Sequence, residues 1–276
     1  MPELPEVEII RRGMEGAILG KGIKSAIVNR YDLRIPIPQD FSMRVTNKVL
    51  TSLERRGKYI IMHIGDDISA ILHLGMSGRI RIFKSGDTYE PRKHDHIVIT
   101  MDDGTLFAFE DPRRFGMLYI AGSDWQTEKP FIAMGPEPLN DNWSGSDLFE
   151  KLARKKSPIK TALLDQRVVA GLGNIYVCEA LFRASIAPTR LSNSITKAES
   201  KRIVKYSQEI LKEAIEAGGS TLKDYQHTDG SLGYFQHGFA VYDQEGADCH
   251  NETCRAQISR IIQAGRSTFY CPECQK

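Results

Sequence analysis

The sequence has little of what marks a membrane or secreted protein. It holds no run of about 18 apolar residues, so no membrane-spanning helix is expected. Its acidic start, MPELPEVE, lacks the basic residues and the apolar stretch of a signal peptide, and we therefore expect a cytosolic protein without a membrane partner. The net charge is also small, because Lys+Arg of 37 nearly balances Asp+Glu of 35 and leaves +2. Overall charge therefore does not indicate nucleic-acid binding, and that interpretation depends on where the basic residues lie.

Cysteine is scarce, with 5 residues in a chain of 276, and most of it lies in the tail. Two close pairs of thiolates are the ligand set of a closed tetrahedral zinc site, which leaves no open position for catalysis. We therefore expect one structural Zn²⁺ in a tail with almost no core of its own, with His250 as a rival ligand. The four expected ligands have the spacing Cys249-x4-Cys254-x16-Cys271-x2-Cys274.

The first half of the chain predicts one helix followed by strands. Apolar residues recur at helical spacing over 5–18, with Pro5 and two glutamates in the first turn. Between about 23 and 120, short runs rich in Val, Ile, Thr and Phe alternate with Gly and Asp, and DDG at 102–104 indicates a hairpin. This region predicts an antiparallel β-sandwich or barrel.

The second half is expected to be helical, which makes the fold class α+β. FIAMGPEPLNDNWSGS, at 131–146, is the best linker in the sequence. DLFEKLARKK, PIKTALLDQ and NIYVCEALFRA predict short helices, and Thr196 with Glu199 forms a capping box before a long one. Residues 218–236 show no clean period, and a polar stretch of that length is typical of a lid, a binding loop or a disordered segment.

Basic residues gather in four local patches, LERRGKYI, DPRRFG, LARKKSPIK and GRSTF. Several contain a glycine or an aromatic residue, which suits a nucleic-acid backbone with unstacked bases nearby. Arg260 and Arg266 lie between the cysteine pairs, where a finger held by metal presents them to phosphate. GLGNIY at 171–176 places two glycines before a helix, so its amides and Asn174 form a candidate phosphate cradle. One such patch is usually a solvated surface, but four patches and a zinc finger favour DNA or RNA binding.

The first residues have a second interpretation besides the start of a helix. Removal of Met1 would leave Pro2 as a terminal secondary amine, whose pKa near ~8 leaves far more neutral nucleophile at pH 7 than a lysine pKa of ~10.4. Such an amine attacks a sugar carbon or aldehyde and forms an iminium intermediate. Glu3 beside it is placed to move protons, and Glu6, one helical turn on, to orient or hydrate the site.

These motifs occur in an order that resembles one known family along essentially the whole chain. PELPEVE at the start, RRGKY, HLGMSG, DPRRFG, GLGNIY and a four-cysteine finger ending in CQK are together similar to bacterial formamidopyrimidine-DNA glycosylases, also called 8-oxoguanine-DNA glycosylases. The resemblance implies an N-terminal β-sandwich with a leading helix, a helix–two-turns–helix domain and a zinc finger. The implied boundaries are 1–132 for the catalytic domain, 133–147 for a linker, 148–240 for the DNA-binding domain with its lesion loop, and 241–276 for the finger.

The resemblance also implies the activity and the site. An enzyme of this family extrudes an oxidised purine from double-stranded DNA, expels it through a Schiff base at the terminal proline, and cuts the strand by β- and δ-elimination. A monomer acting on DNA in the cytoplasm, at the bacterial nucleoid, is expected. The expected catalytic group is Pro2, Glu3, Glu6, Lys58 and Arg266. The expected DNA contacts are His73, Met76, Arg113, Phe115, Lys160, Asn174, Ser220 and Arg260.

Two departures and two alternatives accompany this resemblance. The first cysteine pair is separated by four residues, where the family more often has a tighter knuckle, and Arg255 stands where glycine is usual. One alternative is the sister endonuclease VIII type, which removes oxidised pyrimidines; Leu4, the RRF stretch and the long 218–236 segment favour the purine enzyme. The other is a non-catalytic zinc-ribbon protein that binds nucleic acid, which leaves the Pro-Glu start unexplained.

Overall fold

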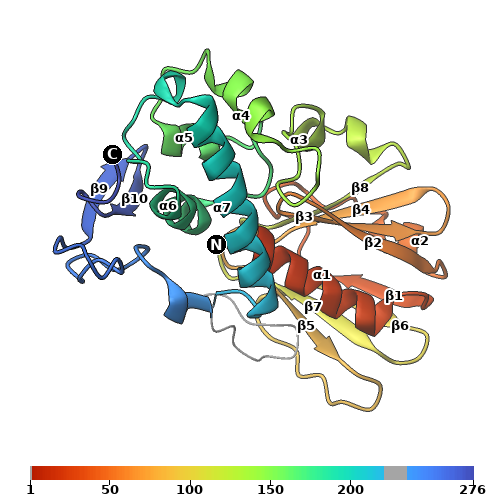
Figure 1. The fold of residues 1–276 in the computed structure, drawn as a ribbon. Helices are drawn as coiled ribbons and strands as arrows, with labels where there is room; N and C mark the ends of the chain where they lie inside the picture. Colours follow the sequence, from red (N-terminus) through yellow and green to blue (C-terminus); the bar gives the residue numbers. More distant parts are fainter. Residues whose placement is uncertain (1, 221–234) are drawn as a thin grey trace. The chain divides into compact units, whose positions relative to one another are not determined.

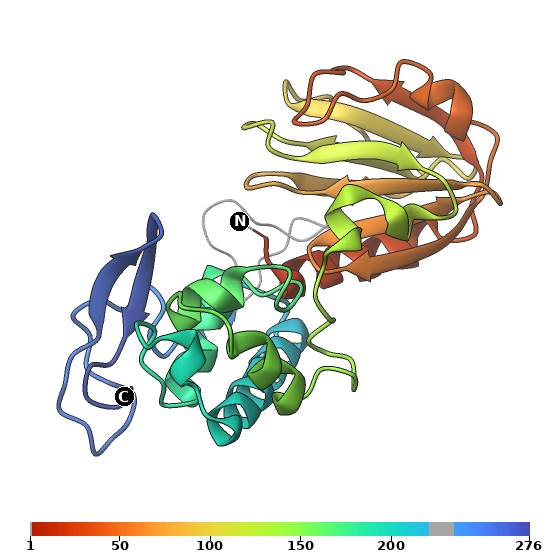
Figure 2. The ribbon, with the colours of Figure 1, turned by 90° about the horizontal axis from the view of Figure 1, so that it is seen from above.

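The structure is a computed structural model that describes residues 2–220 and 235–276 (Figures 1 and 2). The chain divides into two units, Met1–Ile132 with Ala217–Tyr234, and Ala133–Glu216 with Phe235–Lys276. Most of the polar stretch expected to be a binding loop, 221–234, lies outside the described residues. The described helices all fall short of the length and apolarity needed to cross a bilayer.

The first unit is built on two antiparallel sheets of four strands each. The first sheet has the order β1 (Ile23–Val28), β6 (Asp95–Met101), β7 (Leu106–Glu110) and β5 (Arg79–Phe83). The second has the order β2 (Leu50–Arg56), β3 (Tyr59–Ile64), β4 (Ile68–His73) and β8 (Met117–Ala121). Buried side chains of both sheets join in one apolar cluster, as expected for a sandwich.

The hairpin predicted in this unit is confirmed, and three short helical elements were missed. The DDG turn joins β6 to β7 as a hairpin, with Gly104 at a φ of +89° that favours glycine. The stretch from 23 to 120, read from the sequence as strands alone, also contains the short helix α2 (Phe41–Val45). Phe41 and Val45 lie four residues apart and are fully buried, but five residues are too few for a periodic signal. The unit also contains η1 (Trp125–Thr127) and α3 (Lys129–Ile132).

Helix α1 (Leu4–Ile18) carries the N-terminus on this unit and confirms the helix predicted over 5–18 (Figure 1). Proline occupies its first turn, where a missing N–H costs nothing. One face is buried from end to end, including Leu4, Ile10 and Ile18. The helix packs against β2 and β3 of the second sheet and β5 of the first.

A buried carboxylate joins α1 to the second sheet. Glu8 accepts hydrogen bonds from Arg11 and Arg12 of its own helix, and its Oε2 lies 3.0 Å from Nε of Arg55 on β2. Burial alone would raise the pKa of Glu8, but the hydrogen bonds from the two helical arginines and the charges of Arg11 and Arg55 outweigh burial and lower its pKa. The ionised carboxylate therefore stabilises the attachment of the helix.

The second unit is helical and ends in a two-stranded hairpin. A capping box at Thr196 and Glu199 begins the longest helix, as predicted, and Ser144 caps another. The hairpin is antiparallel, with Arg266 opposite Gln263 beside its turn (Figure 2). The elements are α4 (Gly145–Leu152), α5 (Ile159–Leu164), α6 (Asn174–Arg183), η2 (Ser192–Ser194), α7 (Lys197–Glu216), η3 (Phe235–Gly238), β9 (Ser259–Gln263) and β10 (Arg266–Tyr270). The predicted α+β class, with β structure first and helices after it, is confirmed.

Replacing Glu8 with glutamine should lower the free energy of unfolding at pH 7 by about 3 kcal/mol, because Arg11 and Arg55, whose side chains are 15% and 10% exposed, each lose a charged partner. The folded-state pKa of Glu8 is lowered, so this stabilisation is present above its ordinary value of 4.5 and is lost as the pH falls below it. Urea unfolding of the wild type and Glu8→Gln at pH 7 and at pH 4 would measure the effect.

The matched control is Glu15→Gln on the same helix, whose side chain is 40% exposed in its pair with Arg11. This change should cost no more than about 1 kcal/mol. An equal difference between wild type and Glu8→Gln at both pH values would contradict the assignment.

Candidate active site

Residues 2–6 are buried at the first turn of α1. Pro2 is buried, and the exposed fraction of both Glu3 and Glu6 is 2%. Glu3 is the N-cap residue, and its backbone N–H donates to Oε2 of Glu6 at 2.9 Å. The other oxygen of Glu6 accepts from the backbone N–H and the hydroxyl of Ser220. Three of the predicted site residues, Glu3, Glu6 and Ser220, are therefore joined by one carboxylate.

Lys58 and His73 lie at adjoining ends of paired strands. Lys58 is 8% exposed in the turn between β2 and β3, and Tyr59, which follows it, pairs with His73. Burial, together with the positive charges of Lys58 and Arg34, lowers the pKa of His73 to about 4. The ring is therefore neutral at pH 7. Its Nδ1 accepts from the N–H of Gly75 at 3.0 Å, which leaves the ring proton on Nε2 as a donor.

Met76, Arg113 and Phe115 lie on two loops that abut each other. Met76 is 36% and Phe115 43% exposed, and the Arg113 guanidinium lies 5.0 Å from the centre of the Phe115 ring. A Cβ on Gly75, at a φ of +65°, would lie 2.4 Å from the carbonyl carbon of Phe115. This contact requires glycine, and it holds the loop of Met76 directly against the loop of Phe115.

A fully buried carboxylate, Asp111, fixes both loops. Its Oδ1 accepts from the hydroxyl of Ser77 at 2.6 Å and its Oδ2 from the N–H of Gly116 at 2.7 Å, while Ser77 accepts from the N–H of Arg113. Sequence reasoning treated Asp111 only as part of a basic patch. The side chains of Arg113 and Phe115 are thus presented from a rigid base.

In the second unit, Lys160 and Asn174 support the hairpin that carries the finger arginines. Lys160 is fully buried, and its Nζ donates to the carbonyl of Ser267 at 3.0 Å and to the hydroxyl of Thr268 at 2.7 Å. Asn174 Nδ2 donates to the same carbonyl at 2.9 Å. Arg266, the neighbour of Ser267, is exposed. Lys160 and Asn174, which were expected to contact phosphates, therefore both bind the backbone next to Arg266, a third residue expected to do so.

Arg260 lies on the opposing strand of the same hairpin. Its Nε donates to the hydroxyl of Ser267 at 3.1 Å, and its Nη1 lies 3.3 Å from Oε2 of Glu245. The guanidinium also lies 6.0 Å from the centre of the Phe269 ring. Arg260 and Arg266 are both exposed, so the hairpin displays two cations.

The four cysteines of the tail converge as the zinc interpretation requires. Their sulfur atoms all lie within 4.8 Å of one another, and His250 is not part of the cluster. The Cys249–Cys274 and Cys254–Cys271 sulfur pairs are each 3.7 Å apart. Zinc–sulfur bonds of about 2.3 Å in a tetrahedron place sulfurs about 3.8 Å apart, so these residues fit one structural Zn²⁺.

The finger also has an apolar core, which the sequence did not indicate. Val241, Ile258 and Phe269 are buried with the cysteines against Cys178 of α6. Glu179 of α6, 1% exposed, accepts hydrogen bonds from the backbone N–H groups of Ala240, Val241 and Tyr242. Glu179 is the one carboxylate within the apolar run NIYVCEALF, and this placement could have indicated that it is buried and binds backbone N–H groups.

Asn251 orders the four residues that separate Cys249 from Cys254 in the first knuckle. Its side-chain oxygen accepts from the N–H and the hydroxyl of Thr253, and its Nδ2 lies 3.6 Å from the sulfur of Cys274. Its backbone N–H also points at the sulfur of Cys249, at 3.5 Å. Asn251 thus orders the knuckle and directs two donors at zinc ligands.

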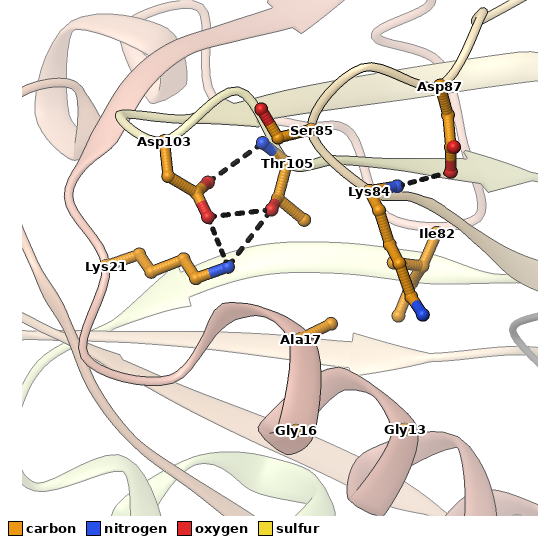
Figure 3. A pocket seen from close by; sticks show the side chains of 10 residues that line it. All are labelled: Gly13, Gly16, Ala17, Lys21, Ile82, Lys84, Ser85, Asp87, Asp103 and Thr105. Carbon is orange, nitrogen blue, oxygen red and sulfur yellow. Dashed lines mark hydrogen bonds and ion pairs between the residues drawn. The ribbon is translucent and has the colours of Figure 1, made fainter.

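A separate hollow of about 630 Å³ lies along the C-terminal half of α1 and contains none of the predicted site residues (Figure 3). Gly13, Gly16 and Ala17 form one wall. Lys21 reaches across it to Asp103, at 2.6 Å, and to the hydroxyl of Thr105, at 3.0 Å. These polar groups satisfy one another, so the hollow adds nothing to the candidate site.

Asn251→Ala should raise the rate of zinc loss about 10- to 100-fold, because residues that orient metal ligands contribute to metal affinity on that scale. Transfer of zinc from the purified protein to a chromogenic chelator would measure it. Asn193→Ala, at an exposed asparagine outside the finger, is the matched control. Equal zinc release from both variants would show that Asn251 does not secure the knuckle.

Comparison with protein families gives matches to three domain models in succession. They are the formamidopyrimidine-DNA glycosylase N-terminal domain over residues 1–118, the H2TH domain of the same enzymes over 134–226, and a zinc finger found in FPG and IleRS over 252–276. Together they cover most of the chain.

Whole-chain relatives agree with these matches. The chain is 48% identical to formamidopyrimidine-DNA glycosylase of Cereibacter sphaeroides over 283 residues and 49% identical to that of Roseobacter denitrificans over 287, with both chains covered in full each time. Solved structures also match over 100% of both chains. They include MutM with DNA containing carbocyclic 8-oxo-G, at 37% identity and a TM-score of 0.89, and a Lactococcus lactis Fpg variant with DNA containing Fapy-dG, at 36% and 0.90. The chain therefore belongs to the formamidopyrimidine-DNA glycosylase family.

Proposed function

We propose that this chain is a base-excision repair enzyme that removes oxidised purines from double-stranded DNA and then cuts the strand as an AP lyase. The observation that carries the proposal is the burial of Pro2 and of Glu3, the N-cap residue of α1. Residues this close to the start of a chain are usually exposed, so burial of both favours a chemical role. The DNA bound in two structural relatives, which contains carbocyclic 8-oxo-G in one and Fapy-dG in the other, supports the same lesion class.

The proposed chemistry begins once Met1 has been removed and the base has been extruded from the stack. The neutral amine of Pro2 attacks the sugar C1′, the bond to the base breaks, and the base leaves with a proton supplied by Glu3. The attached nitrogen then loses its proton, the C1′–O4′ bond of the sugar ring breaks, and O4′ takes up a proton, which gives the open-chain iminium. Loss of a proton from C2′ of the resulting iminium then expels the 3′ phosphate, and a second elimination expels the 5′ phosphate. Lys58 and Arg266 are the cations proposed to assist these eliminations.

The remaining residues are proposed to hold the DNA. Met76, Arg113 and Phe115 fill the space left by the extruded base, where an apolar wedge and a planar guanidinium replace lost stacking and pairing. His73 donates its Nε2 proton to the DNA backbone. Ser220 is proposed to meet the oxidised base, whose other contacts are expected in the segment 221–234.

The second unit is proposed to bind phosphates through the finger. Arg266 and Arg260 make direct contacts, and Asn174 adds one from the start of α6. A direct phosphate contact of Lys160 stays a prediction; its buried ammonium favours an indirect role, in which it holds the hairpin backbone next to Arg266. The zinc ion supplies structure only, because four sulfur ligands leave no position for water or substrate.

The enzyme is proposed to act as a monomer in the cytoplasm, at the nucleoid where its DNA substrate lies. The division into a catalytic domain at 1–132, a linker at 133–147, a DNA-binding domain at 148–240 and a finger at 241–276 is part of the same proposal. The order of the three matching domain models, over residues 1–118, 134–226 and 252–276, supports this division of the chain.

Borohydride trapping on a duplex containing 8-oxoguanine tests the central step. The wild type should form a covalent adduct with DNA, because borohydride reduces the iminium to a stable amine. Pro2→Gly, or a chain that retains Met1, should lose the adduct. Absence of any adduct from the wild type would contradict the proposed function.

Replacing Arg113 or Phe115 with alanine should slow excision of 8-oxoguanine from duplex DNA by about 10-fold or more, because each loses part of the group that replaces the extruded base. Cleavage at a preformed abasic site, which has no base to extrude, should suffer less. Single-turnover rates on the two substrates would measure the difference. Arg92→Ala, at an exposed arginine of the same unit, is the control, and equal losses on both substrates would argue against the wedge.

A further inference from the structure

Glu6 connects two parts of the chain that are far apart in sequence. Its Oε1 accepts from the backbone N–H of Ser220 at 3.0 Å and from the hydroxyl of Ser220 at 2.9 Å. Its Oε2 accepts from the N–H of Glu3 at 2.9 Å. All three residues are nearly fully buried, with exposed fractions of 2–3%. Hydrogen bonds to an ionised carboxylate shielded from water are among the stronger ones in a protein.

The backbone before Ser220 is built for this contact. Gly218 and Gly219 have φ of +78° and +75°, a conformation that other residues adopt only with strain. A Cβ on Gly219 would lie 3.0 Å from Cδ1 of Ile9 and 3.4 Å from Oε1 of Glu6. Only glycine therefore lets the chain approach α1 closely enough for Ser220 to reach the carboxylate.

The chemistry of the contact requires a carboxylate. Glutamate offers an acceptor at each oxygen, and both oxygens of Glu6 receive donors. Glutamine in the same place would offer one acceptor and one N–H₂ group, so either Glu3 or Ser220 would face a donor instead of an acceptor. Because its oxygens are engaged by the protein, Glu6 is suited to hold other groups in place.

We propose that Glu6 is a positioning residue that braces Ser220 at a set distance from Glu3 and Pro2. The inference rests on the proposed function, in which Ser220 meets the oxidised base and Pro2 attacks the sugar of the same nucleotide. Excision requires the base and C1′ to be aligned together, and small misplacements of bound groups are costly to such a step. Elimination at an abasic site has no base to align, so it depends less on the brace.

Gly219→Ala tests the brace without touching a group placed at the substrate. It should slow single-turnover excision of 8-oxoguanine about 10- to 100-fold, the range expected for loss of a hydrogen bond to a charged group. Cleavage of a preformed abasic site should slow less, so the ratio of the two rates falls. Gly20→Ala is the matched control, because Gly20 has a φ of +76° but nothing within 4 Å of its Cβ position. Equal slowing of both reactions by Gly219→Ala would overturn the proposal.

A double-mutant cycle provides the second test. Glu6→Gln and Ser220→Ala should each slow excision, and their combined effect should be less than multiplicative, because both remove the bond between the Ser220 hydroxyl and the Glu6 carboxylate. Independent, multiplicative losses would overturn the brace. Hydrogen exchange at the Ser220 amide, expected to be faster in Glu6→Gln, reports on the contact without any activity. Unchanged exchange contradicts the brace, whereas a wild type that traps no borohydride adduct contradicts the proposed function instead.

Discussion

The carboxylate of Glu6 accepts hydrogen bonds from Glu3 and Ser220, and through them the first turn of α1 is joined to the chain that follows α7. A nucleophilic amine must be held in position relative to the carbon that it attacks. A residue next to a chain end can be held only by the residues that follow it and by their contacts. Here α1 supplies that support, since its own position is secured by a buried apolar face and by the ion pairs of Glu8. The first turn of α1, where Pro2 is proposed to react, is thus fixed by carboxylates that the helix itself carries.

At two other places in the protein, a buried polar side chain binds the backbone that carries an exposed side chain of the candidate site. Asp111 binds the loops that present Arg113 and Phe115, and Lys160 binds the hairpin strand that begins at Arg266. In each case the exposed side chain is rigid because its backbone is bound from beneath. Such presentation reduces the entropy lost when a loop or a hairpin grips a ligand.

Local patterns predicted the parts of the structure that local forces determine. Helical periodicity located α1, the DDG turn located the β6–β7 hairpin, and cysteine spacing located the zinc ligands. The buried polar groups that support the exposed side chains were not predicted, because their hydrogen-bond partners lie far away in the sequence. Lys160 lies in a basic stretch that reads as a surface patch, yet it is bonded to Ser267, 107 residues away in sequence. Sequence order carries no signal for such pairs, and resemblance to a family identifies residue types without their burial.

His73 differs from the lysines and arginines proposed to touch the DNA backbone, because it carries no charge at neutral pH. Its ring is uncharged at neutral pH and keeps its proton on a fixed nitrogen, because burial and neighbouring cations hold its pKa at about 4. A neutral donor displaces no counterion from DNA, so its contribution to affinity does not weaken as ionic strength rises. Nor does it change as a cell acidifies by a unit or two. The contact proposed for His73 would therefore persist at salt concentrations that weaken the phosphate contacts proposed for lysine and arginine.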